Sequence, residues 1–367
     1  MTSRPIGESA AISVEVRDFG RTKSGAPAHA YVLRNDAGVE AVVTDFGATL
    51  VSLLVPDRAG NVADIVLGFD DVTGYEGDGN QYFGCTAGRV ANRVARGKFT
   101  LDGADYALAI NNPPNSLHGG DQGFGQRLWT ATPLPGIASV RFDYFSPNGQ
   151  EGYPGNLDSS VTYTLTSDSE LVIEYSAHTD AATPMNLTHH SYFNLAGAGH
   201  PSVLDHVLQI NAGRYTPTDE TLIPTGEVVT VADTPLDFRV PMRIGARIAS
   251  LDGTAALGYD HNYAVRDAAL RPNLADIIAA GPVARLSDPS SGRVLEVYSD
   301  QPGLQFYTGN FLFGQWGKGG AAYPHRSACC LETQGYPNAI NEPGFPTTVL
   351  RPGQTYKQIT VHRLLLD

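Results

Sequence analysis

Two adjacent histidines, His189 and His190, lie in the polar segment of residues 186–195 and are the first candidates for chemistry. Histidine can give and take a proton near neutral pH. If the segment is extended, its side chains alternate between two faces. One face then carries Asn186, Thr188, His190, Tyr192 and Asn194, and the other carries Leu187, His189, Ser191, Phe193 and Leu195. The alternation predicts that His190 faces a polar cleft and His189 a packed layer.

The same alternation bears on metal binding. Adjacent residues of a strand point to opposite sides, so His189 and His190 cannot easily share one ion. No other residues have the spacing of zinc ligands. We therefore expect no metal centre.

A single carboxylate, Glu332, follows an apolar run that begins at Ala328, with no lysine or arginine close to it in the sequence. A carboxylate in such a context is costly unless it is hydrogen-bonded or used in a reaction. Glu332 is therefore a candidate catalytic group. The alternative is a buried glutamate that a distant arginine holds.

Two further polar clusters could bind a ligand. In residues 88–93, Arg93 could donate forked hydrogen bonds to a pair of sugar hydroxyls or to a carboxylate. In residues 111–120, two prolines and a glycine pair indicate a shaped loop that carries His118. The alternatives are a surface arginine and a capped turn in which His118 binds a backbone carbonyl.

A third cluster, residues 257–263, contains Asp260 between two tyrosines. Asp260 could accept hydrogen bonds from sugar hydroxyls, while Tyr259 or Tyr263 supplies a flat apolar surface. The alternative is a turn that the aspartate closes through its own backbone.

Strand patterns that could position these side chains run through the whole chain. In residues 97–111, two alternating runs flank Asp102-Gly103, which is a strong hairpin signal. The alternation of apolar and polar residues also occurs in residues 171–175 and in parts of 39–55, 294–299 and 356–364.

The one convincing helical period is short and consists of Ile244, Ile248 and Leu251. There are 40 glycines and 24 prolines, which favour many tight turns over long helices. We find no repeat and no linker. These features predict an all-β fold, a large β-sandwich with very little helix, in a single domain of residues 1–367. Two packed β-domains are the alternative.

The bulk composition limits the partners. The formal net charge is −13, which disfavours nucleic acid and anionic membrane surfaces but not a neutral sugar. No apolar stretch is long enough to span a bilayer, and the N-terminal residues lack the apolar core of a signal peptide. Three cysteines, Cys85, Cys329 and Cys330, form no disulfide framework. We expect a soluble, reduced protein of the cytoplasm, although a removed signal peptide would make the periplasm its location.

Seven motifs together resemble those of the aldose 1-epimerase family, whose members are also called galactose mutarotases. They occur in the family's order over roughly residues 39–367, and their combination is specific although no single motif is. The motifs are GRVANRVARGKF, NNPPNSLHGG, NLTHHSYFNLAG, YTPTDETLIPTGE, GYDHNY, QPGLQFYTGNF and LETQGYPNAIN.

The resemblance implies a sandwich of the supersandwich type with an open cleft, no cofactor and a free monosaccharide as substrate. It implies that Glu332 is the general base and His190 the general acid in opening and reclosing the sugar ring. It further implies that five residues hold the sugar's hydroxyls and ring oxygen: Asn92, Arg93, His118, Asp260 and Gln305.

Ordinary pKa values of ~4.3 for glutamate and ~6.5 for histidine would leave this pair close to the needed states at neutral pH. A carboxylate such as Asp260 would favour the protonated form of His190.

Two residues depart from the family pattern. His189 replaces the usual asparagine before the catalytic histidine, and Asn338 stands where an aspartate is usual. Because neither should touch a catalytic group, we expect them to influence sugar preference and not reaction type. Members of the family act on hexoses, pentoses or phosphorylated hexoses, so the resemblance leaves the sugar and the oligomeric state open.

Three other functions compete with anomer exchange. A retaining glycosidase would use Glu332 with Asp260 as two carboxylates about 5–5.5 Å apart. A carbohydrate-binding module would hold the sugar without converting it. A mutarotase for hexose 6-phosphates would need a basic pocket for the phosphate, which the net charge of −13 disfavours.

Overall fold

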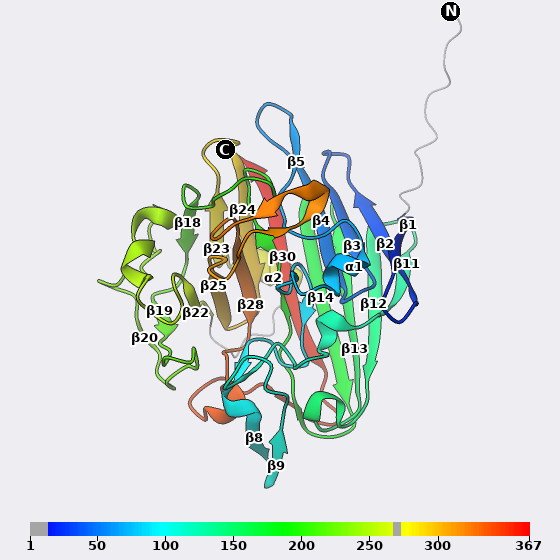
Figure 1. The fold of residues 1–367 in the computed structure, drawn as a ribbon, viewed down its shortest axis with the longest axis vertical. Coiled ribbons are helices and arrows are strands. Elements are labelled where there is room, and N and C mark those ends of the chain that lie inside the picture. Colours follow the sequence, from blue (N-terminus) through cyan, green and yellow to red (C-terminus); the bar gives the residue numbers. More distant parts are fainter. Residues whose placement is uncertain (1–13, 267–272) are drawn as a thin grey trace, which may run out of the picture.

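Three large antiparallel sheets organise the computed structural model, which describes residues 14–266 and 273–367 (Figure 1). The nine-stranded sheet consists, in spatial order, of β11 (Thr130–Leu134), β12 (Ser139–Ser146), β13 (Leu157–Leu165), β14 (Glu170–Thr179), β30 (Tyr356–Leu366), β24 (Arg293–Ser299), β23 (Ala284–Ser287), β18 (Val207–Ile210) and β21 (Met242–Arg243). The six-stranded sheet consists of β17 (Tyr192–Phe193), β28 (Cys329–Gln334), β25 (Gly303–Tyr307), β22 (Asp260–Ala264), β19 (Arg214–Thr216) and β20 (Val229–Thr230).

The remaining strands form a five-stranded sheet near the N-terminus and five two-stranded pairs. The five-stranded sheet runs β1 (Glu15–Arg21), β2 (Pro27–Arg34), β3 (Glu40–Thr44), β4 (Thr49–Pro56) and β5 (Val62–Asp64). The pairs are β6 (Thr86–Ala87) with β16 (Thr188–His189), β7 (Arg93–Val94) with β10 (Ser116–Leu117), β8 (Lys98–Leu101) with β9 (Ala104–Ala107), β15 (Thr183–Pro184) with β29 (Val349–Leu350), and β26 (Gln315–Trp316) with β27 (Ala322–Tyr323).

The predicted strands are present, and the expected β-sandwich is confirmed. The alternating runs at 39–55, 171–175, 294–299 and 356–364 lie in β3, β4, β14, β24 and β30. The hairpin at 97–111 is β8 and β9, which projects at the bottom of Figure 1. At its turn, Asp102 and Gly103 have φ of 51° and 82°, the left-handed pair that a tight hairpin requires.

The apolar core lies between the sheets and explains why the strands alternate. Leu171, Ile173 and Tyr175 of β14 are buried in one cluster with Phe306 of β25 and Val43 of β3. Because one cluster draws side chains from all three large sheets, burial of apolar surface holds the layers together.

The helix prediction was wrong in detail. Ile244 and Ile248 each begin a short 3-10 turn, η4 (Ile244–Ala246) and η5 (Ile248–Leu251), and not one α-helix. The two α-helices of the described residues are α1 (Val72–Tyr75) and α2 (Leu274–Ala279). Helix α2 starts where the Asn273 side chain accepts a hydrogen bond from Asp276 N–H, and its apolar side packs on the outer face of β14, β24 and β30. The other 3-10 turns are η1 (Ala95–Gly97), η2 (Phe124–Gln126), η3 (Gln150–Gly152), η6 (Lys318–Gly320) and η7 (Ala339–Asn341).

The three cysteines are unpaired and buried, as the sequence predicted. Over residues 14–266 and 273–367, no helix has the length and apolar character needed to cross a bilayer. The N-terminal residues considered for a signal peptide lie outside the described residues.

A buried arginine ties the sheets together on the side away from the hairpin. Arg293 of β24 is 3% exposed and donates to three backbone carbonyls, those of Val55, Leu195 and Asn61. Val55 lies in β4, Asn61 in the turn between β4 and β5, and Leu195 two residues after β17, so one side chain joins β24 to both of these segments.

We predict that Arg293→Met destabilises the protein by about 3–5 kcal/mol, because three carbonyls lose their donor and each unmade bond costs about 1–3 kcal/mol. Denaturant unfolding followed by circular dichroism measures this. The matched control is Arg141→Met, since Arg141 is 51% exposed in its ion pair with Asp143 and should contribute no more than about 1 kcal/mol. Equal losses in the two variants would contradict the bridging role.

Candidate active site

Strand β28 delivers Glu332 to one face of the six-stranded sheet. Glu332 pairs with Gln305 of β25, and Gln305 in turn pairs with Asn262 of β22. Two residues away along the same three strands, Cys330 pairs with Tyr307, and Tyr307 pairs with Asp260. Paired residues of an antiparallel sheet share a face, so the register alone gathers the proposed base, an amide and a second carboxylate on one surface.

His190 reaches the same place from the segment of residues 186–195. The segment is not one continuous strand as expected, because β16 pairs with β6 and β17 pairs with β28, and His190 lies between them. Its N–H donates to the Cys85 carbonyl, and its carbonyl accepts from Gly84 N–H. His190 does face the cleft, and Tyr192 stacks on its ring with 5.2 Å between centroids.

The rest of the predicted polar face behaves differently. Asn186, Thr188 and Asn194 do not line the cleft; each makes hydrogen bonds to backbone carbonyls instead. On the other face, His189 is buried against Tyr163, as the alternation predicted. The alternation therefore separated the two histidines correctly, but it overstated how much of the segment lines the cleft.

His118 directly follows β10, the short strand at the end of the loop that begins after β9. Its Nδ1 accepts a hydrogen bond of 3.2 Å from the N–H of Asn92. The next residue, Gly119, has φ of 90°, and a Cβ there would lie 1.9 Å from the Gly88 carbonyl oxygen. Only glycine permits this close approach, so Gly119 holds the loop against residues 88–93 and sets the position of His118.

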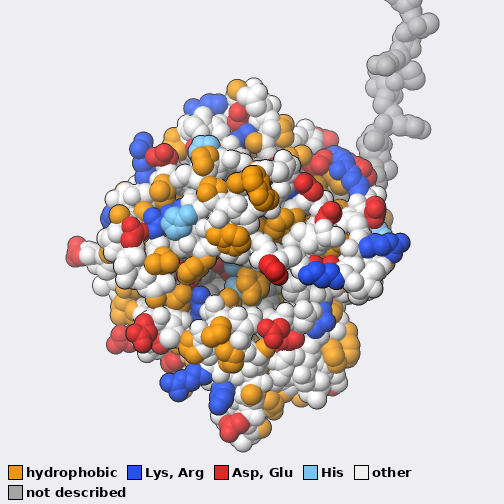
Figure 2. Space-filling model, in the orientation of Figure 1, with side chains coloured by type: hydrophobic (Ala, Val, Ile, Leu, Met, Phe, Trp, Pro, Cys, Tyr) orange, Lys and Arg blue, Asp and Glu red, His pale blue; other side chains and the backbone are white. Residues whose placement is uncertain are grey.

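These side chains line a cavity of about 360 Å³, large enough for a small ligand. Figure 2 shows a recess near the middle of this face, with histidine atoms visible inside it. The lining residues are Gln81, Tyr82, Asn92, Arg93, Asn112, Pro113, Leu117, His118, His190, Tyr192, Glu220, Thr221, Leu222, Ala255, Asp260, Tyr307, Phe311 and Glu332. Six of the seven site residues named from the sequence are among them.

The seventh, Gln305, lies behind the cavity wall. Its Nε2 donates to Asp260 Oδ1 at 2.6 Å, so it holds that carboxylate and does not line the cavity itself. Asp260 also faces Arg93, with 3.6 Å between Oδ2 and Nη1, and Arg93 Nε donates to Asn112. The one arginine of the wall is therefore already matched by a carboxylate and an amide.

The flat apolar surfaces come from other residues than expected. Tyr259 and Tyr263 are fully buried in the core, where their hydroxyls donate to the Pro235 and Leu236 carbonyls. Tyr82, Tyr192, Tyr307 and Phe311 line the cavity instead. Tyr307 could have been found, since it stands two residues after Gln305 on a strand; nothing in the sequence around Tyr82 marks it.

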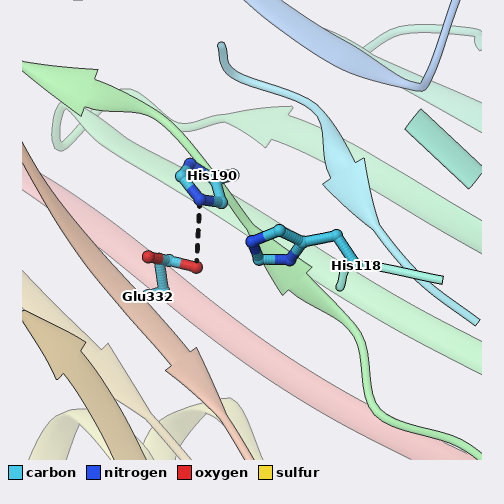
Figure 3. A group of neighbouring side chains, drawn as sticks. All are labelled: His118, His190 and Glu332. Atoms are coloured by element: carbon cyan, nitrogen blue, oxygen red, sulfur yellow. Dashed lines mark ion pairs between the residues drawn. The ribbon is translucent and has the colours of Figure 1, made fainter. Parts of the chain in front are cut away.

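His190 and Glu332 face each other at the centre of the cavity, with 3.5 Å between Nε2 and Oε2 (Figure 3). Both side chains are at most 5% exposed. Although the pair is within ion-pair distance, Glu332 Oε2 makes no aligned hydrogen bond with any described residue. That oxygen therefore has capacity for a donor on a bound ligand.

Burial changes the proton affinities of this pair. Desolvation raises the pKa of Glu332 well above its ordinary value, Asp260 raises it further, and Arg93 opposes both. Desolvation lowers the pKa of His190 to about 4, against its own backbone carbonyl and Asp260. Burial therefore opposes the order expected from ordinary pKa values, because neither charged form is well solvated there. Both shifts favour a proton on Glu332 over one on His190.

His118, His190 and Glu332 also form a group in which one possible metal-ligand atom from each lies within 4.8 Å of the others. The spacing of neighbouring histidines in the sequence did not predict this group. A metal-binding histidine donates its other N–H to an acceptor. Nδ1 of His118 instead accepts from a backbone N–H, so Nε2 carries the proton. The group fits a proton-transfer site better than a metal site.

The two departures from the family pattern lie outside the cavity wall. His189 Nε2 lies 2.7 Å from the Ser191 hydroxyl, on the core side of the sheet. Asn338 accepts from Ala95 N–H, and its own N–H donates to the Arg93 carbonyl. Asn338 thus supports the backbone of Arg93.

Comparison with known proteins agrees with this geometry. The family model described as aldose 1-epimerase matches residues 29–363. The galactose mutarotase of Sus scrofa is 46% identical over 351 residues, which is 95% of this chain and 98% of that protein.

The chain belongs to the aldose 1-epimerase family. The aldose 1-epimerase of Escherichia coli is 35% identical over 94% of this chain and 97% of that protein. A crystal structure of an aldose epimerase homologue from C. elegans aligns with a TM-score of 0.83 and 32% identity, covering 92% of this chain and 99% of that one. The chain is accordingly an isomerase that interconverts the α and β anomers of an aldose.

We predict that stability falls as the pH is lowered from about 6.5 toward 4. Six buried histidines have pKa values below the ordinary value because burial disfavours their charged form: His118, His189, His190, His206, His261 and His362. The unfolded chain takes up protons below about 6.5 that the folded chain cannot, so each group can cost roughly 1.4 kcal/mol per pH unit.

Denaturant unfolding at pH 7.5, 6.5, 5.5 and 4.5 measures this dependence. His362→Phe removes one of the six groups and should flatten the dependence of stability on pH. The two ring nitrogens of His362 make no hydrogen bond with described residues. A free energy of unfolding that stays constant between pH 6.5 and 5 would contradict the assignment of neutral buried histidines.

Proposed function

We propose that Glu332 and His190 carry out the anomer exchange, with Glu332 as the general base and His190 as the general acid. The observation that carries the proposal is their direct opposition, 3.5 Å apart, in the wall of a cavity of about 360 Å³. Opening a hemiacetal needs a base at the C1 hydroxyl and an acid at the ring oxygen, and these two side chains have the chemistry for both.

The proton transfers balance. Glu332 Oε2 takes the proton of the C1 hydroxyl. The electron pair left on the hydroxyl oxygen forms the C1 carbonyl, and the bond from C1 to the ring oxygen breaks. The ring oxygen takes the proton of His190 Nε2. After rotation about C1–C2, the ring oxygen attacks the other face of the carbonyl and both protons return. No proton is consumed, so the pair is ready for the next sugar.

Sugar binding would move the pair toward the reactive state. In the empty cavity, burial favours a protonated Glu332 and a neutral His190. A C1 hydroxyl that donates to Glu332 Oε2 stabilises the carboxylate and lowers its pKa. The shared proton then moves to His190, which Asp260 favours. The mechanism requires this hydrogen bond, together with Asp260, to outweigh the burial that favours the neutral pair.

The other wall residues would hold the sugar. Asn92, Arg93 and Asp260 offer donors and acceptors to hydroxyls, and His118 offers the N–H on its Nε2. Gln305 would act through Asp260, which it orients. The rings of Tyr192 and Tyr307 would pack on the apolar faces of the sugar.

The substrate class follows from the wall. The name of the Sus scrofa relative specifies galactose, and the name of the Escherichia coli relative specifies the broader class of aldoses. We infer a free, neutral aldose, such as glucose, galactose or a pentose. Among the described residues of the wall, Arg93 is the one fixed cation, and Glu220, Asp260 and Glu332 are acidic. The unpaired cysteines favour a reducing compartment, the cytoplasm.

We predict that Glu332→Gln and His190→Asn each lower kcat by roughly 10²–10⁴-fold, the usual contribution of a positioned acid or base. Glu332→Gln should keep its affinity for sugar, since the amide retains the shape of the side chain. Polarimetry of freshly dissolved α-galactose measures the rate. The controls are Glu174→Gln on the exposed face of β14 and His189→Asn in the core. Near wild-type turnover by either site variant would overturn the assignment of that group.

We predict that the protein accelerates mutarotation of α-glucose, α-galactose or α-xylose and leaves glucose 6-phosphate at its spontaneous rate. A phosphate near Asp260, Glu220 and Glu332 would meet three carboxylates and one engaged arginine. Polarimetry at constant ionic strength compares the four sugars. Acceleration of the phosphorylated sugar alone would contradict the inferred substrate class.

A further inference from the structure

Cys330 occupies a position that the proposed reaction does not use. It precedes Glu332 by two residues on β28, so both side chains point to the same side of the sheet. It packs with Tyr192 and Tyr307, two residues of the cavity wall. Its Sγ lies 3.7 Å from Nδ1 of His190, the ring nitrogen opposite to the one that faces Glu332.

We propose that Cys330 is a positioning residue for His190: its thiol is the hydrogen-bond partner of Nδ1 in both protonation states of the ring. The proposal rests on the role of His190 as the acid. A thiol can donate through S–H and accept at sulfur. It can therefore donate to the bare Nδ1 of the neutral ring and accept from the N–H of the charged ring.

This property matters because the reaction runs through both states in every cycle. His190 gives its proton when the ring opens and takes it back when the ring closes. A carboxylate at the position of Cys330 would stabilise the charged ring, as the aspartate of a serine-protease triad does. A carbonyl could only accept. A neutral group that both donates and accepts keeps the ring oriented in both states and adds no charge of its own.

The surroundings keep the thiol neutral. Cys330 is fully buried, and burial together with the nearby Glu332 carboxylate raises the pKa of the thiol well above its ordinary value. The thiol therefore stays protonated, and a third charge does not enter a site that already contains the His190–Glu332 pair.

The neighbouring Cys329 supplies a matched comparison. It is equally buried, but it points to the other side of β28 and packs in the core between the sheets with Leu331 and Phe193. A substitution at Cys329 removes the same atoms from the same strand without touching His190.

The test compares Cys330→Ala, Cys330→Ser and Cys329→Ala by polarimetry over a range of pH, with thermal unfolding for each variant. We expect Cys330→Ala to lower kcat roughly 3- to 10-fold, the value of one neutral hydrogen bond, with KM changed less than about twofold. Serine should restore part of the rate, because a hydroxyl donates and accepts. Cys329→Ala should keep the wild-type kcat.

The pH profile separates positioning from packing. The charged ring loses its acceptor at Nδ1 in Cys330→Ala, and a bond to a charged group is the stronger one. The basic limb of kcat, where the acid loses its proton, should therefore move to lower pH in this variant. The ionisable groups that face His190 are Glu332 from β28, Asp260 from β22, Tyr192 from β17, and His118 and Tyr82 from the loops. All of these are unchanged in the three variants.

Equal rate losses in Cys330→Ala and Cys329→Ala, with the basic limb unmoved, would overturn the proposal. If Cys330→Ala does not fold, ¹⁵N chemical shifts of the histidine rings decide between the outcomes. Cys330→Ser should shift both ring nitrogens of His190, and Cys329→Ser should not. Unchanged shifts in Cys330→Ser would overturn the proposal. An active His190→Asn would instead overturn the acid role itself, which distinguishes the two failures.

Discussion

The site depends on the burial of one carboxylate beside one imidazole. In water, Glu332 would be charged at neutral pH and His190 largely neutral, and the two would barely interact. Inside the cavity wall both charged forms lose solvation, so burial favours two neutral groups, and only the attraction between the charges opposes this. The sheets and loops around the cavity keep these two side chains 3.5 Å apart and keep bulk water away from them.

In the proposed isomerisation the pair passes between these two states. A permanently charged pair would resist giving up the proton, and a permanently neutral pair would resist taking the one on the C1 hydroxyl. Asp260 and Arg93, which are 3.6 Å apart, act on Glu332 in opposite directions. In the proposed mechanism, the hydroxyl of the bound sugar adds a further influence that favours the Glu332 carboxylate. The neutral thiol of Cys330, which adds no charge at Nδ1, belongs to the same balance.

Rigid backbone contacts account for the geometry of the loops. Gly119 approaches the Gly88 carbonyl more closely than any side chain would permit, and this contact brings His118 against Asn92. Asn338 binds the backbone on both sides of Val94, so the chain that follows the base also holds Arg93. The side chains proposed to bind the sugar are thus supported by backbone, which loses little entropy when a ligand binds.

The sequence by itself determined the strand-rich fold, the turn at Asp102-Gly103 and the opposite orientations of His189 and His190, because period-two alternation and turn chemistry are local. Its motifs also named six of the residues that line the cavity. Tertiary structure decided the rest. The pairing of β22 with β25 placed Gln305 behind Asp260, and the other face of that sheet took Tyr259 and Tyr263 into the core. The pairing of β17 with β28 brought Cys330 to His190 from 140 positions away. Burial, a property of the assembled sheets, then reversed the order of proton affinities that isolated side chains would have. No local pattern contains that information, because desolvation depends on which distant residues exclude the water.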